Sequence, residues 1–173
     1  MNLNFNEIGN LPPGRYEIAF DDAKSFFVDA FPDSETRLKN WNSFYAYIQI
    51  IISTGIDEFK LWVDGSFVTK KLNPRDIDCV VYVKASLVNS LSLEAQERLA
   101  KYLIPQNRSM HEFNKNLYCT DSYILLDIED SPNFPNHDFI MEKKKYWDDL
   151  WGHDRQGNAK GYIILSVKGG KCQ

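Results

Sequence analysis

The sequence predicts a single domain of the α/β (α+β) class, in which helices pack on a mixed β-sheet. Segments with apolar residues at helical spacing alternate along the chain with short segments rich in β-branched and aromatic residues. A chain of 173 residues, 43% of them apolar, is large enough for one substantial core, and no internal repeat or linker interrupts it. We therefore expect a core over residues 34–168, an N-terminal arm over 1–33 and a loose tail over 169–173.

The first third of the chain is expected to hold one short strand and two helices. Alternation of residue types over 15–20 predicts an extended segment. A short helix should follow and stop at Pro32, and a longer helix should run over residues 34–53, with Gly55 as its C-terminal stop. The apolar stripe expected on the longer helix consists of Leu38, Trp41, Tyr45, Ile48 and Ile52.

The helical spacing of apolar residues and the alternation typical of strands also predict the later elements. Strands are expected at residues 59–63, 77–82, 119–128 and 162–167, and helices at 92–104 and 138–151. Pro105 should end the first of these helices. The second should expose the lysines at 143–145 and bury Ile140, Trp147, Leu150 and Trp151. Residues 106–116 have no clear period, so a solvated connection is expected there, with a mobile loop over the site as the alternative.

Composition narrows the class of function. The formal net charge of −4 argues against extensive nucleic-acid binding, which needs a broad basic face. The three cysteines are far apart and form no C-x-x-C pattern, so neither a disulfide framework nor a zinc knuckle is expected. The N-terminus has no basic leader with a long apolar run, and no stretch approaches the length of a membrane span. We expect a cytoplasmic protein without a membrane segment.

The most informative stretch lies between Trp62 and Val81, where two apolar segments flank a Gly-Ser turn and an Asp-x-Asp pair. Gly65 ends the first segment where a side chain would hold a ligand away from the backbone, and Ser66 adds a hydroxyl to amides that can bind an anion. Asp76 and Asp78 are two residues apart on a predicted strand, so their carboxylates share a face. Such a pair can hold Mg²⁺ together with substrate phosphates.

Gly65-Ser66, nine intervening residues and then Asp76-Ile77-Asp78 resemble the signature of the nucleotidyltransferase fold. This superfamily includes DNA polymerase beta, aminoglycoside nucleotidyltransferases and the minimal nucleotidyltransferases of toxin–antitoxin loci. The segments at 11–14 and 154–161 resemble a small bacterial branch of it, so the resemblance covers most of the chain. Alone, Asp-x-Asp is usually a solvated strand start and Gly-Ser a turn, but both at this spacing, each on an apolar strand, favour the functional interpretation.

The superfamily pattern requires a third acid on the strand that follows the crossover helix. Asp121 and Asp127 both lie on one face of the strand at 119–128. A helix between two adjacent strands implies a parallel crossover, so the starts of the two strands lie together. Asp76, Asp78 and Asp121 all stand near the start of a strand, whereas Asp127 stands at the far end. This topology selects Asp121 as the third catalytic and metal-binding carboxylate.

The resemblance implies a nucleotidyltransferase that uses two Mg²⁺ ions to transfer an NMP group from an NTP, with ATP as the expected nucleotide. Asp76 and Asp78 would hold the metal ions, and Gly65 and Ser66 would grip the terminal phosphates. It favours a hydroxyl on a partner protein as the acceptor, in a toxin–antitoxin or antiviral defence system. The alternatives are a small-molecule or RNA-end acceptor, and an inactive binding module that serves as an antitoxin or complex subunit.

Other candidate residues carry weaker signals. Thr69 and Lys70 follow the Gly-Ser turn and are candidates for nucleotide binding, and Lys71 and Arg75 stand in the same loop; loop lysines are more often simply solvated. The three histidines share no metal-ligand spacing and are expected at the surface or at caps. The chain has neither a P-loop motif nor the G-x-S-x-G context of a hydrolase serine.

Overall fold

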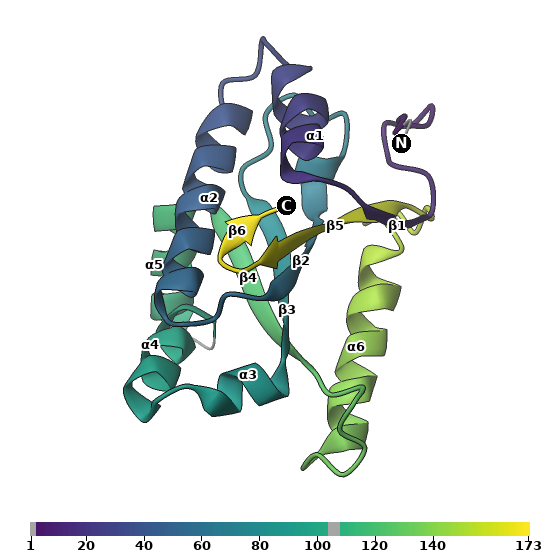
Figure 1. The fold of residues 1–173 in the computed structure, drawn as a ribbon. Helices are drawn as coiled ribbons and strands as arrows, with labels where there is room; N and C mark the ends of the chain where they lie inside the picture. Colours follow the sequence, from purple (N-terminus) through teal and green to yellow (C-terminus); the bar gives the residue numbers. More distant parts are fainter. Residues whose placement is uncertain (1–2, 104–107) are drawn as a thin grey trace.

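The computed structural model describes residues 3–103 and 108–173, which form one mixed α/β domain (Figure 1). Five strands of its six-stranded sheet follow the order β1-β5-β2-β3-β4, and β6 pairs with β5. The strands are β1 (Gly14–Glu17), β2 (Phe59–Asp64), β3 (Ile77–Lys84), β4 (Thr120–Asp127), β5 (Gly161–Lys168) and β6 (Lys171–Cys172). All four strands expected after residue 58 are therefore confirmed. None of the described helices is long and apolar enough to cross a membrane.

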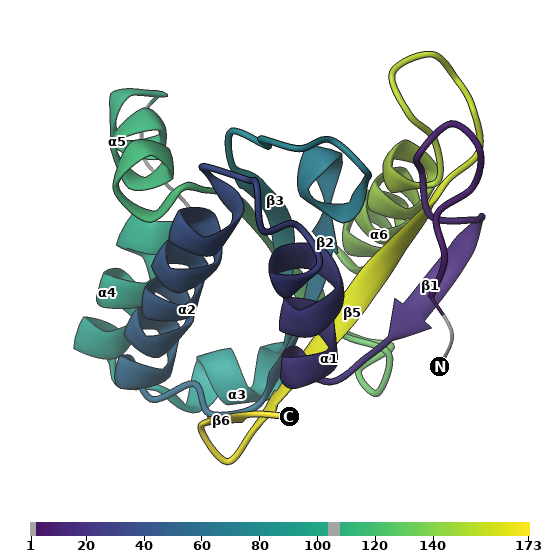
Figure 2. The same cartoon turned by 90° about the horizontal axis from the view of Figure 1, so that it is seen from above.

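One face of the sheet carries the larger core, under α1 (Phe20–Lys24) with its π-helical extension to Asp29 and under α2 (Arg37–Ser53) (Figures 1 and 2). The predicted stripe of α2 is partly wrong, because Leu38 and Tyr45 are 53% and 47% exposed. The buried face consists of Arg37, Asn40, Trp41, Phe44, Tyr47, Ile48 and Ile51. Arg37 and Asn40 are polar and donate hydrogen bonds to carbonyl oxygens of the loop between β2 and β3. A pattern of apolar residues alone therefore cannot locate this face.

The other face of the sheet is packed against α6 (His137–Trp151), on the side opposite α2 (Figure 1). This smaller core contains Trp62, Val80, Leu125, Trp151, Tyr162 and Ile164, with Ile140 and Trp147 packed against it. Leu150, which was expected to be buried, is 47% exposed. Strand residues alternate between the two cores, as the period of two requires.

The crossover from β3 to β4 is parallel, as predicted, and pairs Asp78 with Asp121 in register. It consists of α3 (Ala85–Ser90), α4 (Leu93–Leu103) and α5 (Arg108–Tyr118). The expectation of a connection over 106–116 was wrong from residue 108 onward, and the expected helix end at Ile104 and Pro105 lies outside the described residues. The sequence of α5 has no recognisable apolar stripe, because polar Asn114 is buried while Phe113 and Leu117 are 63% and 53% exposed.

The two ends of the chain belong to the sheet. β1 pairs with β5 in parallel, so part of the predicted arm is an edge strand. The tail is not loose: Gly169 and Gly170 have positive φ angles of 57° and 69° and turn the chain back, so that β6 pairs with β5. The Phe20 amide donates to the Gln173 carbonyl oxygen at 2.8 Å, which ties the C-terminus to α1.

Candidate functional site

Four carboxylates gather where β2 ends and β3 and β4 begin. Asp64 is paired in register with Asp78, and Asp78 with Asp121, so these three residues form one row across adjacent strands. Asp76 lies just before β3. Trp62, Val80 and Leu125 belong to the core under α6, so the row, an even number of residues away on each strand, faces the same side of the sheet. The structure thus brings together all three acids predicted from the sequence and adds Asp64.

The row carries unbalanced negative charge. Burial raises the pKa of Asp78 to about 6, and the neighbouring carboxylates of Asp76, Asp121 and Asp64 add to this rise, while Lys115 opposes it. Removal from water penalises an ionised carboxylate, and like charges nearby penalise it further. A cation placed among these oxygens would relieve both penalties, which is the electrostatic property expected of a metal or phosphoryl-transfer site.

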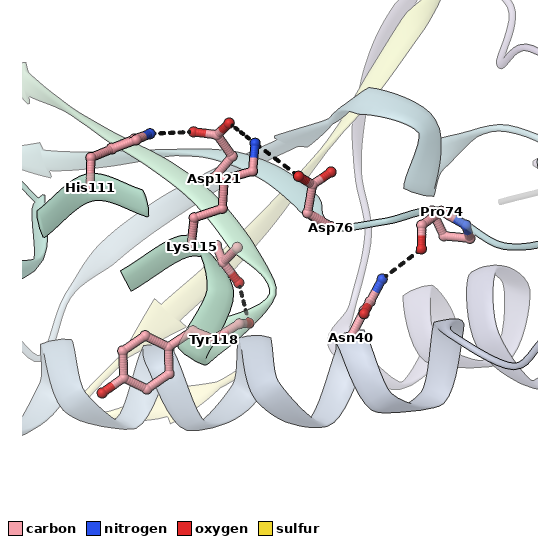
Figure 3. Close-up of polar contacts among 8 residues, drawn as sticks. Asn40, Pro74, Asp76, His111, Lys115, Tyr118 and Asp121 are labelled. Carbon is pink, nitrogen blue, oxygen red and sulfur yellow. Dashed lines mark hydrogen bonds and ion pairs between the residues drawn. The ribbon is translucent and has the colours of Figure 1, made fainter. Parts of the chain in front are cut away.

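Two side chains of α5 contact the acids (Figure 3). The Lys115 Nζ lies 2.9 Å from an oxygen of Asp76 and also contacts Asp121, so it bridges the two carboxylates. His111 Nε2 lies 3.0 Å from the other oxygen of Asp121. Although burial by itself would lower the pKa of Lys115, the hydrogen bonds to Asp121 and Asp76 raise it above its ordinary value.

His111 and Lys115 were missed at the sequence level, where they were assigned to the surface and to a solvated connection. A signal was present: residues 111, 114, 115 and 118 share one helical stripe, and this stripe is polar or aromatic rather than aliphatic. This stripe faces inward. The Asn114 side-chain amide donates to the Lys101 carbonyl at 2.9 Å, Tyr118 packs against the larger core, and His111 and Lys115 contact the acids.

Asp64 forms a buried ion pair that the sequence did not suggest. Its carboxylate accepts a hydrogen bond from Lys160 Nζ at 2.5 Å, and the residues are 4% and 6% exposed. Burial raises the pKa of Asp64 to about 6 even though Lys160 opposes the rise. Lys160 thus supplies positive charge at the β2 end of the row, as Lys115 does at the β4 end.

The flanking segments that resembled a bacterial branch explain how Lys160 is placed. The Asn10 side chain donates to Asp154 at 2.9 Å, and the Gly161 amide donates to the Leu11 carbonyl at 3.1 Å. At Gly161 a Cβ would lie 2.3 Å from the Pro12 carbonyl oxygen, so only glycine permits this contact. The two segments therefore pack together and fix the start of β5, next to Asp64.

The Gly-Ser turn lies directly against the acids. Gly65 has a φ angle of +75°, and a Cβ there would lie 1.7 Å from Oδ2 of Asp78. The space expected to admit a phosphate is thus bordered by the Asp78 carboxylate, and glycine is required for that carboxylate to fit. Thr69 closes the turn by donating its hydroxyl to the Ser66 carbonyl at 2.8 Å, while the Lys70 side chain is exposed.

The loop between β2 and β3 is held in place by the start of α2. Arg37 is fully buried and donates to four carbonyl oxygens, at 2.6–2.8 Å, on Phe27, Phe67, Thr69 and Lys71. Asn40 donates to the Pro74 carbonyl at 3.0 Å (Figure 3). Burial lowers the pKa of Arg37 to about 10, which still leaves it charged at neutral pH. The backbone between the Gly-Ser turn and Asp76 is therefore fixed by one helix.

A family of unknown function, DUF6932, matches residues 3–166, which is nearly the whole chain. The chain belongs to DUF6932. Comparison with curated proteins and with solved structures gave no match for this DUF6932 chain. The family assignment carries no activity with it.

The acids of this DUF6932 chain suit a divalent cation, but Lys115 is placed among them. Within residues 3–103 and 108–173, no three acidic, histidine or cysteine side chains already converge as a metal site. The carboxylates are hard oxygen donors of the kind Mg²⁺ prefers, and Lys115 already bridges two of them with a positive charge. A metal ion could take this position if the flexible Lys115 side chain moved aside.

Proposed function

We propose that the chain is a Mg²⁺-dependent nucleotidyltransferase, with a fold of the nucleotidyltransferase type, that transfers an NMP group from an NTP to a hydroxyl acceptor. One observation carries the proposal: Asp76, Asp78 and Asp121 meet at one end of adjacent strands, with the Gly65 turn packed against Asp78. Phosphoryl transfer needs carboxylates for metal ions beside backbone amides for phosphate oxygens, and both lie at this end of the sheet.

Each residue has a role in this proposal. Asp76 and Asp78 would hold the metal ions, and Asp121 would complete the acceptor side. When bound, Mg²⁺ would neutralise charge on the phosphates and on the attacking and leaving oxygens. The Gly65-Ser66 turn would bind the terminal phosphates through its amides and the Ser66 hydroxyl.

Asp121 is the group proposed to accept the proton of the acceptor hydroxyl. As that oxygen bonds to the α-phosphorus, the bond from the α-phosphorus to the oxygen bridging to the β-phosphate breaks, and pyrophosphate leaves. His111 contacts Asp121 at 3.0 Å and would hold the carboxylate in position. Lys115 would release Asp76 and Asp121 when the metal-bound nucleotide arrives, since one set of oxygens cannot serve both cations fully.

The proposal is tested by incubating the protein with each α-labelled NTP, Mg²⁺ and cell lysate, and locating the label on protein, RNA or small molecules. We expect transfer from ATP to protein, with loss of transfer in Asp78→Asn. Asp127→Asn is the matched control, because it removes a carboxylate from the far end of β4. Absence of both transfer and Mg²⁺-dependent NTP binding would refute the proposal.

A second candidate function is a binding module that keeps the fold but has no chemistry. The observation that favours it is the bridge from Lys115 to Asp76 and Asp121, which satisfies two carboxylates without a metal ion. Calorimetric titration with Mn²⁺ and a non-hydrolysable ATP analogue separates the two functions. In a transferase both ligands bind, and Lys115→Met tightens metal binding; in a binding module neither binds to either protein.

A further inference from the structure

β4 is the terminal strand of the sheet on the side of the third carboxylate. The Ile77 amide donates to the Cys119 carbonyl at 2.9 Å, which fixes how the parallel ladder alternates. The backbone groups of residues 121, 123 and 125 face β3, so those of Ser122, Ile124 and Leu126 point away from the sheet. Within the described residues, β4 pairs with no strand other than β3.

A cavity of about 940 Å³ lies along this outer edge. Residues 122–126 of β4 line it without a gap, and α5 and α6 contribute its walls. At about 3.3 Å per residue, this stretch is roughly 16 Å long. Asp78 also lines the cavity, and Asp121 directly precedes the lining stretch of β4, so the cavity opens onto the acid row.

The cavity wall on the α6 side is aromatic and partly exposed. The rings of Tyr123 and Trp147 lie 4.7 Å apart, and those of Tyr146 and Trp147 lie 5.4 Å apart. Tyr146 and Phe139 are 52% and 58% exposed, which is unusual for aromatic side chains grouped together. An apolar ligand in the cavity would cover this surface.

The charge of the lining differs from that of the whole chain. Arg108, His111 and Lys143 line the cavity, and Asp78 is the one acid among its described lining residues. The chain as a whole has a formal net charge of −4. An occupant that carries some negative charge is therefore better matched to this cavity than to the rest of the surface.

We propose that the cavity binds an extended peptide of a partner protein, which pairs with the outer edge of β4 and presents a hydroxyl side chain to Asp121. This inference rests on the proposed function for the role of the hydroxyl, but the binding itself does not. Main-chain pairing with an exposed strand edge is an established mode of peptide recognition. It uses the outward amides and carbonyls of Ile124 and Leu126, which are only half-buried and which the sugar–phosphate backbone of a nucleic acid could not match.

The same geometry defines the chemistry of the peptide. Side chains on an added strand alternate between the two faces of the sheet. If the serine, threonine or tyrosine lies opposite Asp121, the side chains two and four residues away lie opposite Tyr123 and Leu125, against the aromatic wall. These two positions should be apolar, and acidic residues should be favoured elsewhere because of Arg108 and Lys143.

The experiment is a binding screen without nucleotide, using an array of labelled ten-residue peptides with a fixed serine, threonine or tyrosine and randomised flanks. We expect selection of apolar residues two and four positions from the hydroxyl residue, on one side of it. Ile124→Pro removes an outward amide without removing a bond to β3, and should weaken binding of the selected peptides at least tenfold. Ile124→Ala is the matched control, because it also loses the side chain but keeps the amide.

A second measurement uses the wild-type protein, so it does not depend on how well the proline variant folds. Two versions of the selected peptide are N-methylated, one at the odd-numbered and one at the even-numbered residues. The version whose methylated amides face β4 should not bind, and the other should bind nearly as well as the unmethylated peptide. Absence of selected peptides, equal effects of N-methylation in both versions, or binding of a ten-nucleotide single-stranded RNA in place of peptides would overturn the inference. If ATP and Mg²⁺ are then added and neither NTP binding nor NMP transfer occurs, selective peptide binding would still support the inference, whereas the proposed function would be refuted.

Discussion

At the residue scale, the contact between Gly65 and Asp78 is the most restrictive feature of the site. A Cβ at Gly65 would overlap the carboxylate of Asp78, the residue that lies in register with both Asp64 and Asp121. The residue is thus needed for the shape of the acid row itself, in addition to any approach of phosphates to the backbone. A substitution at Gly65 should therefore act on metal and nucleotide together.

Gly65→Ala should abolish Mg²⁺-dependent NTP binding and destabilise the fold by about 1–3 kcal/mol from backbone strain alone. Ser66→Ala should cost only roughly 0.5–1.5 kcal/mol of NTP affinity, and NMP binding should respond much less to that change. Gly157→Ala is the control, because φ is +82° there but nothing lies within 4 Å of the added carbon. Equal NTP affinity in the two glycine variants would show that the contact with Asp78 is unimportant.

Asp121→Asn should lower turnover by a factor of roughly 10²–10⁴, because the group proposed to accept the proton is lost. Nucleotide affinity should change less. Asp127→Asn should have little effect, since Asp127 pairs with Lys84 at the opposite end of the same strands. Single-turnover rates and NTP affinities of both variants test this, and the reverse ranking would contradict the assignment made from the parallel crossover.

Asp78→Asn should inactivate the protein but stabilise it at neutral pH in the absence of metal. The folded-state pKa of Asp78 is raised from 3.8 to about 6, which corresponds to roughly 3 kcal/mol. Well below pH 3.8 the carboxyl is protonated in both the folded and unfolded states, so the substitution does not change stability there. The gain should appear between pH 4 and 6 and be complete above pH 6. Urea unfolding of the wild type and the variant at pH 4 and pH 7.5 measures the gain in stability. If the variant differs from the wild type by the same amount at both pH values, the raised pKa of Asp78 is not the cause.

At the scale of elements, the start of α2 organises the site without touching it. The single buried guanidinium of Arg37 satisfies carbonyls from the turn after β2 and from η1, the π-helical segment Ser25–Asp29. Asn40 fixes the backbone just before Asp76. The acid pair and the Gly-Ser turn are therefore held in place by hydrogen bonds to one helix, in addition to the sheet.

Arg37→Met should destabilise the protein by more than about 3 kcal/mol, because several buried carbonyl groups lose their donors together. Lys39→Met changes an exposed basic residue of the same helix and should shift stability by less than about 0.5 kcal/mol. Urea unfolding of both variants gives the comparison. A small effect at Arg37 would mean that water can replace its donors.

At the scale of the whole molecule, both termini close the fold around β5. β1 pairs along one edge of β5 and β6 pairs with its end, while the segments around Leu11 and Asp154 meet at its start. The ion pair of Lys160 with Asp64 connects this assembly to the acid row. The site therefore depends on parts of the chain that are far away in sequence.

Deletion of residues 170–173 should lower the melting temperature by roughly 2–8 °C, which corresponds to about 1–2 kcal/mol for a chain of this size. It removes β6 and the bond from the Phe20 amide to Gln173. Lys171→Ala, at an exposed side chain of β6, is the control and should melt as the wild type does. An unchanged melting temperature after the deletion would mean that β6 adds nothing to stability.

The sequence alone is enough to predict β2 to β5, the parallel crossover, and the meeting of Asp76, Asp78 and Asp121 beside Gly65. These follow from local periodicity and from the direction of neighbouring strands. The sequence could not show which face of α2 is buried, that residues 108–118 are helical, or that Asp64, His111, Lys115 and Lys160 join the site. These features depend on tertiary contacts, because polar side chains are buried when distant partners satisfy them. No local pattern indicates a partner 96 residues away, as in the pair of Lys160 with Asp64.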